Sequence, residues 1–290
     1  EERDNATKTY FPNGVAPKAG AVFKNPDLAE TLTALAEHGR SAFYEGSIAR
    51  AMVDYFESID ADLTLDDLTT HRGEWVEPRG VDYHGYTLYQ LPPNGQGFAA
   101  LMMLNILKQV DLRRFERGSP ELFHFMVEAK RLAFEAMAGT FADPAYSAIP
   151  IDTLLSDEFA KRQFSRIRPD QVIEPQHLAV PLEGEGDTTY LTVVDGEGMM
   201  VSLIQSNYRG MGSGLVPTGL GFMLQDRGEL FSLDPSHPNV YAPGKRPFHT
   251  IIPAFLMKNG APFMSFGLMG GGMQPQGHVQ VLVNIADFGM

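Results

Sequence analysis

The chain has 290 residues and 43% hydrophobic content, enough to bury the core of one large domain or two modest ones. Its formal net charge of −13 argues against nucleic acid as a partner, because affinity for a phosphate backbone depends on clustered lysine and arginine. Cysteine is absent, and the eight histidines show no metal-ligand spacing, so we expect no disulfide, no thiolate nucleophile and no metal or other cofactor.

No stretch reaches the eighteen or so uninterrupted apolar positions of a membrane-spanning helix, so we expect no membrane partner. The first residues, Glu1 to Lys8, lack the basic and apolar stretches of a secretory signal, although both ends of the chain look cut. The compartment is left open on these grounds, with the cytoplasm favoured over the periplasm.

The first half of the chain is predicted to be rich in helices. A helix is expected from Pro26 to Gly39, because Asn25 is a good N-cap and leucines follow at three- and four-residue spacing. Apolar periodicity predicts a second helix from about Ser41 to Ile59. Further helices are indicated at about Gln96 to Gln109 and from Pro120 to about Ala138.

Two regions show the alternation that is typical of strands. Between Trp75 and Leu91 it predicts a strand pair that turns at His84-Gly85. From Thr189 to Ser206, a β-branched run, the turn Gly196-Glu197-Gly198 and a second run predict a tight hairpin of two buried strands.

The end of the chain carries another hairpin signal, around the turn Lys258-Asn259-Gly260-Ala261. Gly270-Gly271-Gly272 then opens a terminal helix.

From Arg166 to Asp187 the sequence is rich in proline and ends in a run of glycine and acidic residues. Such a segment buries too little apolar surface to offset its ordering entropy, so a mobile loop is expected. Thr188 follows at the head of a predicted strand. A self-cleaving precursor requires this arrangement, because a cut between Asp187 and Thr188 makes Thr188 a new N-terminus.

A freed Thr188 would carry its own base. Its hydroxyl is the nucleophile, and its α-amino group has an unperturbed pKa of about 7.7–8.0, which suits a general base near neutral pH. Taken alone the pattern leaves a plainer alternative open, since a threonine between a loop and a strand is usually just a good β-former.

The run from Thr188 to Gly198, TTYLTVVDGEG, resembles the cleavage-site block of the gamma-glutamyltranspeptidase family, in which the first threonine of a pair becomes the catalytic N-terminus. Further blocks resemble family segments in the right order, so the likeness covers nearly the whole chain. These blocks are Asn25–Ala29, Ala42–Gly46, Pro92–Gly97, Gly212–Gly214, Pro243–Pro247 and Gly270–Gly271.

The resemblance implies an α+β fold, a four-layer αββα sandwich of the N-terminal nucleophile hydrolase type that this chain covers only in part. Residues 1–187 would be the C-terminal part of the large (alpha) subunit and 188–290 the N-terminal part of the small (beta) subunit, both in one sandwich domain. The two products of self-cleavage would pair as a heterodimer, or further as (αβ)2. The expected substrate is a small-molecule amide or γ-glutamyl-like compound.

The resemblance also implies roles around the nucleophile. The backbone amides of Gly270 and Gly271 would form an oxyanion hole, and their alternative role is a simple strand-to-helix turn. Ser206 aligns with a hydroxyl residue that hydrogen-bonds the nucleophile, so it is expected to orient Thr188 unless it is only a satisfied strand serine.

Four positions are expected to contact substrate, which are Arg227, His249, Thr250 and Tyr208. His249 and Thr250 fall where the transpeptidases carry a serine pair that contacts the substrate carboxylate, and His249 could be a switchable contact to an acidic substrate. Arg227 could supply a fork for a carboxylate, with a solvent-exposed turn residue as its alternative role.

Two positions depart from the glutamyl transferases. Leu230 stands where those enzymes have an acid that holds the substrate ammonium, and Tyr208 stands where they carry an asparagine substrate contact. The segments PPNGQG and KRPFHT resemble instead the branch with cephalosporin-acylase-like proteins and amidohydrolases of small acidic amides.

We therefore predict an autoprocessing amidohydrolase or acyltransferase in which Thr188 attacks amide bonds of small, acidic substrates. The alternative is a non-catalytic family member, or a fragment with a structural or binding role. A serine hydrolase fits poorly, because the sequence contains no Gly-x-Ser-x-Gly elbow.

Overall fold

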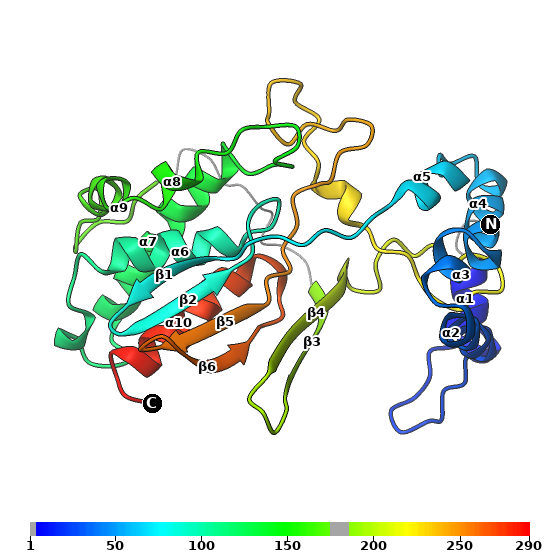
Figure 1. The fold of residues 1–290 in the computed structure, drawn as a ribbon, viewed down its shortest axis with the longest axis horizontal. Helices are drawn as coiled ribbons and strands as arrows, with labels where there is room; N and C mark the ends of the chain where they lie inside the picture. The colour runs from blue at the N-terminus through cyan, green and yellow to red at the C-terminus, as the bar shows by residue number, and fades with distance from the viewer. Residues whose placement is uncertain (1–3, 175–185) are drawn as a thin grey trace. The chain divides into compact units, whose positions relative to one another are not determined.

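A computed structural model describes residues 4–174 and 186–290 of the chain (Figure 1). The chain divides into two compact units. Unit 1 combines the residues up to Trp75 with Met211–Asp226, and unit 2 combines Val76–Gly210 with Arg227–Met290. Every predicted site residue lies in unit 2.

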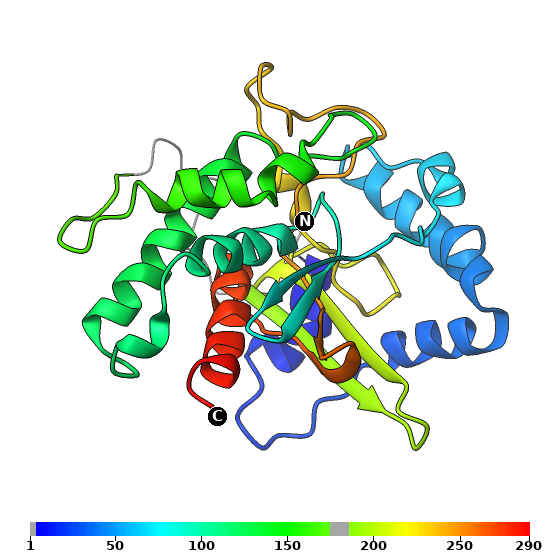
Figure 2. The same ribbon diagram turned by 60° about the vertical axis from the view of Figure 1, so that its left-hand side comes forward.

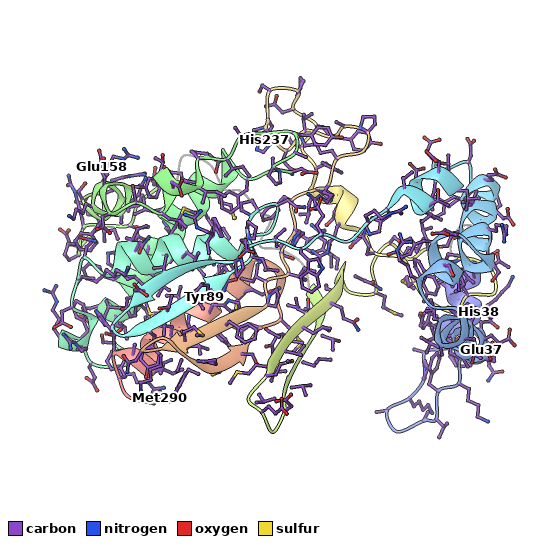
Figure 3. All side chains as sticks on the ribbon, viewed as in Figure 1. Glu37, His38, Tyr89, Glu158, His237 and Met290 are labelled. Atoms are coloured by element: carbon purple, nitrogen blue, oxygen red, sulfur yellow. The ribbon has the colours of Figure 1, made fainter. Side chains whose placement is uncertain are left out.

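Unit 1 is built from short helices, which are α1 (Asp4–Tyr10), η1 (Pro12–Gly14), α2 (Pro26–His38), α3 (Arg40–Tyr44), α4 (Ser47–Ser58) and α5 (Leu65–Thr70). The predicted start of α2 is confirmed, because the Asn25 side chain accepts a hydrogen bond from Leu28 N at 3.0 Å. At its other end Glu37 and His38 lie on the surface (Figure 3). Thr31 Oγ1 donates to Leu220 O at 2.9 Å, which fixes the later segment of unit 1 to α2.

The prediction of one helix from Ser41 to Ile59 is wrong, because the helix breaks between α3 and α4. Gly46 leaves helical geometry there, with ψ at −147°. A β-carbon on Gly46 would lie only 3.1 Å from the backbone of Ala42, so the bend depends on glycine.

Unit 2 is organised around an antiparallel sheet in the order β1-β2-β5-β6 (Figure 1). Its strands are β1 (Arg79–Tyr83), β2 (Tyr86–Gln90), β5 (Ala254–Lys258) and β6 (Ala261–Phe266). Both predicted turns are confirmed. His84 and Gly85 have φ values of 47° and 87°, and Asn259 and Gly260 have 50° and 78°, as two-residue hairpin turns require.

Helices cover one face of this sheet (Figure 1). The helices of unit 2 are α6 (Gly97–Leu107), η2 (Leu112–Arg114), α7 (Pro120–Ala138), α8 (Ile151–Leu154), α9 (Asp157–Phe164), η3 (Arg227–Leu230), η4 (Gly271–Met273) and α10 (Gln274–Ala286). All residues of α6 are buried, since α6 contacts β1 and β2 as well as α7, α9 and α10. None of the helices in the described ranges is long and apolar enough to cross a membrane.

A second, two-stranded sheet pairs β3 (Gly186–Val194) with β4 (Met200–Arg209), as Figure 2 shows. The hairpin itself was predicted, but the first strand begins at Gly186 rather than at Thr189, so Asp187 and Thr188 lie inside β3. Of the predicted mobile loop, residues 175–185 lie outside the described residues.

The prediction that both strands of this hairpin are buried is wrong. One face carries Leu191, Val193, Val201 and Leu203, which are 42–56% exposed. The opposite face meets the larger sheet. There the hydroxyl of Thr192 bonds that of Ser265 on β6. Within this chain the hairpin therefore has one packed face and one open face.

Candidate active site

The hydroxyl of Thr188 meets that of Ser206 across the hairpin. Thr188 is 6% exposed, and its Oγ1 donates to Ser206 Oγ at 3.1 Å. The strand register shifts between Asp187 and Thr188, and such bulges re-aim side chains. Ser206 Oγ also accepts from the backbone N–H of Tyr208 at 2.8 Å. The predicted contact is present, and its role in activation remains a prediction.

Tyr208 provides a buried platform two residues farther along β4. It is 5% exposed, and its φ of 83° is uncommon for an aromatic residue. The guanidinium groups of Arg227 and Arg209 lie over its ring at 5.2 and 5.8 Å from the centroid. Aromatic faces attract such cations.

Arg227 is buried rather than solvent-exposed, which excludes the plainer alternative for this residue. It is 8% exposed, and its Nη1 donates to Thr250 Oγ1 at 3.1 Å. Thr250 is 1% exposed. The structure thus brings together Tyr208, Arg227 and Thr250, which were predicted from separate parts of the chain.

His249 is held by the Pro92–Gly97 segment. Its N–H donates to Asn94 O at 3.1 Å and its carbonyl accepts from Gln96 N at 3.2 Å. A β-carbon on Gly95 would lie 2.7 Å from the imidazole, so glycine allows this close approach. Burial, together with the nearby cations of Arg227 and Arg246, lowers the pKa of His249 to about 4. The ring is neutral near pH 7, so no charge switch is expected there, and a substrate contact remains a prediction.

Gly270 and Gly271 form the turn that leads into η4 and α10. Their φ values of 109° and 56° lie in the left-handed region, which favours glycine. Strand β3 contacts η4, which brings this turn to the strand of Thr188. Backbone N–H groups at a helix start suit an anionic oxygen, and the oxyanion role remains a prediction.

Sequence reasoning missed Gln96. Its Nε2 donates to Thr250 O at 2.6 Å and to Gly271 O at 2.8 Å. The available signal was a polar side chain at the start of a helix that is apolar except for Asn105, because a buried amide must find partners.

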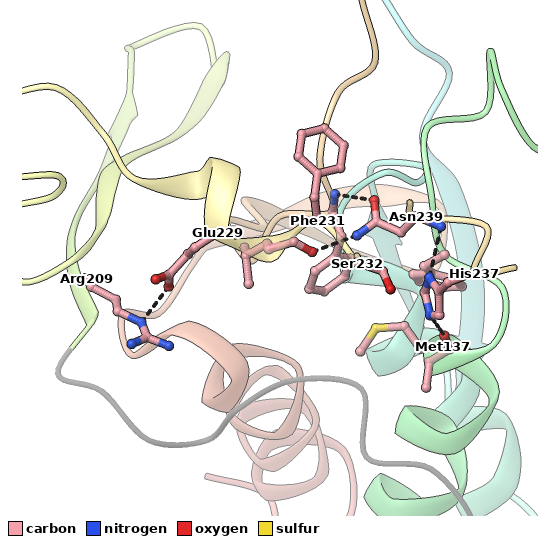
Figure 4. Close-up of a pocket in the computed structure, with 11 residues that line it drawn as sticks. Met137, Arg209, Glu229, Phe231, Ser232, His237 and Asn239 are labelled. Carbon is pink, nitrogen blue, oxygen red and sulfur yellow. Dashed lines mark hydrogen bonds and ion pairs between the residues drawn. The ribbon is translucent and has the colours of Figure 1, made fainter. Parts of the chain in front are cut away.

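A cavity of about 310 Å³ is lined by residues from the ends of α7, β4 and η3 and from the segments that follow α7 and η3 (Figure 4). Arg209 and Glu229, whose Nε and Oε1 atoms are 2.6 Å apart, lie at its wall, and this ion pair was not predicted. Leu230 also lines the cavity, whereas Thr188 does not. The remaining lining residues are Met137, Ala138, Phe141, Phe231, Ser232, His237, Asn239 and Phe248.

Hydrogen bonds hold the segment after η3, which lines this cavity (Figure 4). His237 Nδ1 accepts from Asn239 N at 3.0 Å, and its Nε2 lies 2.9 Å from Ala138 O. Asn239 donates to Leu230 O at 2.7 Å and accepts from Phe248 N at 3.1 Å. No cluster of three or more histidine or acidic residues that could hold a metal occurs in the described part of the chain.

Known proteins resemble this chain in fold and in sequence. The cephalosporin acylase structure from Bacillus halodurans superposes with a TM-score of 0.92 at 42% identity, over 100% of this chain and 52% of that chain. The glutathione hydrolase-like YwrD proenzyme of Bacillus subtilis is 41% identical over 97% of this chain and 53% of its own length. The oxamate amidohydrolase proenzyme of Klebsiella pneumoniae is 36% identical over 93% and 50%.

The chain spans about half the length of the curated relatives it matches. The predicted α+β sandwich of the N-terminal nucleophile hydrolase type, covered in part, is confirmed by the structural match, and so is the likeness to the acylase and amidohydrolase branch. The family model described as gamma-glutamyltranspeptidase matches residues 1–290. The chain belongs to the gamma-glutamyltranspeptidase family.

Proposed function

We propose that Thr188 is the nucleophile of a self-processing amidohydrolase or acylase, and that residues 1–187 and 188–290 belong to its two subunits. The observation that carries this proposal is the buried hydroxyl pair of Thr188 and Ser206, 3.1 Å apart, on a strand that contacts η4. Further support comes from the relatives, which are named as proenzymes.

Processing would begin with attack of Thr188 Oγ1 on the carbonyl carbon of Asp187. The new C–O bond forms as the peptide C–N bond breaks, and the hydroxyl proton passes to the nitrogen that leaves. Water then cleaves this ester, which frees the Asp187 carboxylate and the α-amino group of Thr188. Ser206 Oγ accepts the hydrogen bond of Thr188 Oγ1 and could take part in this proton movement.

In the mature enzyme the α-amine of Thr188 would accept the hydroxyl proton while Oγ1 attacks the substrate carbonyl. The N–H groups of Gly270 and Gly271 would stabilise the oxyanion, with about 2.7–4 kcal/mol from each donor. The amine would return the proton to the leaving group. Water would then release the acid, or an amino acceptor would take the acyl group.

The substrate is proposed to be a small amide with an acidic group. Arg227 supplies a buried guanidinium, and its planar fork suits a carboxylate. Leu230 offers no charge to hold an ammonium, which argues against γ-glutamyl compounds. The Klebsiella relative is named for oxamate, an amide that bears a carboxylate.

The two fragments are proposed to stay together as a heterodimer, with (αβ)2 as the larger assembly that two such heterodimers would form. Strand β2, from the first fragment, pairs with β5, from the second, in one sheet. Helix α6 also packs against α10 across the same division. Cleavage at Thr188 would leave these contacts intact.

Intact-mass measurement of the purified full-length protein tests the proposal. We expect two fragments divided between Asp187 and Thr188, and a Thr188→Ala variant that stays whole. A Thr188→Ser variant is the matched control, because it keeps a hydroxyl nucleophile and should still be cut. An uncut native chain in which Thr188 reacts with no acylating probe would favour the non-catalytic alternative.

A further inference from the structure

The Pro92–Gly97 segment has no part in the proposed reaction, yet it contains a wholly buried glutamine. Gln96 is 0% exposed at the N-terminus of α6. Its Nε2 donates to Thr250 O at 2.6 Å and to Gly271 O at 2.8 Å. One amide group therefore joins two backbone segments that meet at the candidate site.

Gln274 holds the same two segments through a second bond. It is 0% exposed and directly follows η4, and its Oε1 accepts from Ile252 N at 3.2 Å. The other amide atoms, Gln96 Oε1 and Gln274 Nε2, are buried with no hydrogen-bond partner among the described residues. Burying such atoms is costly, so an apolar side chain would serve better if packing were the only role.

These glutamines hold the turn at Gly270 and Gly271, where the absence of a side chain leaves the peptide planes free to rotate. The peptide between Gly270 and Gly271 is fixed because Met273 N donates to Gly270 O at 3.1 Å. The next peptide carries the Gly271 carbonyl, which accepts from the backbone N–H of Gln274 and from Gln96 Nε2. Gln96 thus adds a side-chain restraint to one of the two peptide planes that flank Gly271.

We propose that Gln96 and Gln274 form a glutamine brace, which holds the backbone of Gly271 so that its amide N–H keeps the direction that an oxyanion requires. Both are positioning residues, since they act through the glycine turn and Thr250. The inference rests on the proposed function for the role of this amide. Preorganised donors stabilise a transition state because they need no reorientation during the reaction.

The brace also crosses the proposed cleavage point. Gln96 lies in the first fragment, whereas Gly271 and Gln274 lie in the second. Each fragment alone would lack half of the brace, so the oxyanion site would depend on the paired fragments.

The test measures acylation of Thr188 by p-nitrophenyl acetate, a probe that does not depend on acyl specificity. Release of p-nitrophenolate gives the rate, and peptide mapping of the second fragment by mass spectrometry gives the acetylated residue. In the full-length processed protein, Gln96→Met should slow acylation about 10- to 100-fold, somewhat less than the loss of a whole oxyanion donor. Gln274→Met, which removes one bond to Ile252, should slow it several-fold.

Gln90→Met is the matched control. Gln90 is also a buried glutamine, 1% exposed, but it bonds His278 at 2.8 Å and touches neither Thr250 nor Gly271 through any hydrogen bond of the described residues. It should lose stability without slowing acylation by more than about threefold, which is a minor change beside the loss of an oxyanion donor. Thermal unfolding of all three variants reports the stability change separately.

The proposal is overturned if Gln96→Met acylates at the wild-type rate, or slows only as much as Gln90→Met. If Gln96→Met does not fold, a wild-type rate in Gln274→Met overturns it instead. The two levels of failure are distinguishable. Absence of acylation at Thr188 in the wild-type protein removes the proposed function and the brace together, whereas labelled Thr188 with an unaffected Gln96→Met removes the brace alone.

Discussion

The apolar side chains of the two sheets of unit 2 differ in how far they are exposed. In the four-stranded sheet Leu88 and Leu256 are 0% exposed, because helices cover that face. In the β3–β4 hairpin Val193 and Leu203 are 56% and 42% exposed, yet Thr188 on the same hairpin is only 6% exposed. The candidate nucleophile therefore owes its burial to the elements that surround it rather than to the hairpin alone.

The largest effect is expected from removing apolar volume in the helix layer that covers the four-stranded sheet. Leu104 on α6 is 0% exposed, so Leu104→Ala should lower the free energy of unfolding by about 2–5 kcal/mol. Urea unfolding of the full-length protein measures it. A cost below about 1 kcal/mol would contradict the assignment of α6 to the core.

A second substitution probes the contact between the two sheets. A β-carbon on Gly267 would lie 2.4 Å from the ring of Tyr190 on β3, so Gly267→Ala should cost about 1–3 kcal/mol through overpacking. Thermal unfolding measures this cost. Tyr190→Leu in the same background should recover part of it, and no recovery would place the clash elsewhere.

Mild acid should lower the free energy of unfolding of unit 2 through His278 on α10, at pH values above those at which carboxylates bind protons. Burial lowers the pKa of His278 to about 3, against about 6.5 when unfolded, so the unfolded state binds the proton first. This contribution to stability is complete above pH 6.5 and is lost as pH falls toward 3. Between pH 7 and 5 the loss should reach about 1–2 kcal/mol.

Urea unfolding at both pH values measures this loss, and His278→Gln should reduce it. An unchanged pH dependence in that variant would assign the effect to another group, with His249 as the next candidate because its pKa is also lowered.

The smallest effect is expected on the open face of the hairpin. Leu203→Ser should change the free energy of unfolding by no more than about 0.5 kcal/mol, because a half-exposed side chain loses little burial. Calorimetry of the full-length protein checks this. A cost above about 1 kcal/mol would show that something beyond the described residues covers this face.

Capping residues and turn residues, which act over a few positions of the chain, predicted much of the fold. Helix α7 starts at Pro120 because Ser119 caps it, with its Oγ accepting from Leu122 N at 3.2 Å. The turn at His84-Gly85 follows from residues that tolerate positive φ. The break at Gly46 was not predictable from periodicity, because it depends on how closely the chain passes Ala42.

Short-range patterns predicted the hairpin turns, the family likeness around Thr188 and the helices other than the one that breaks at Gly46, because these depend on residues close together in the chain. Which polar groups meet depends instead on how distant segments pack. Gln96 reaches Gly271 across 175 positions, and Arg227 is buried against Thr250 and Tyr208. Such contacts arise from packing of distant segments, whose pairing no local pattern encodes.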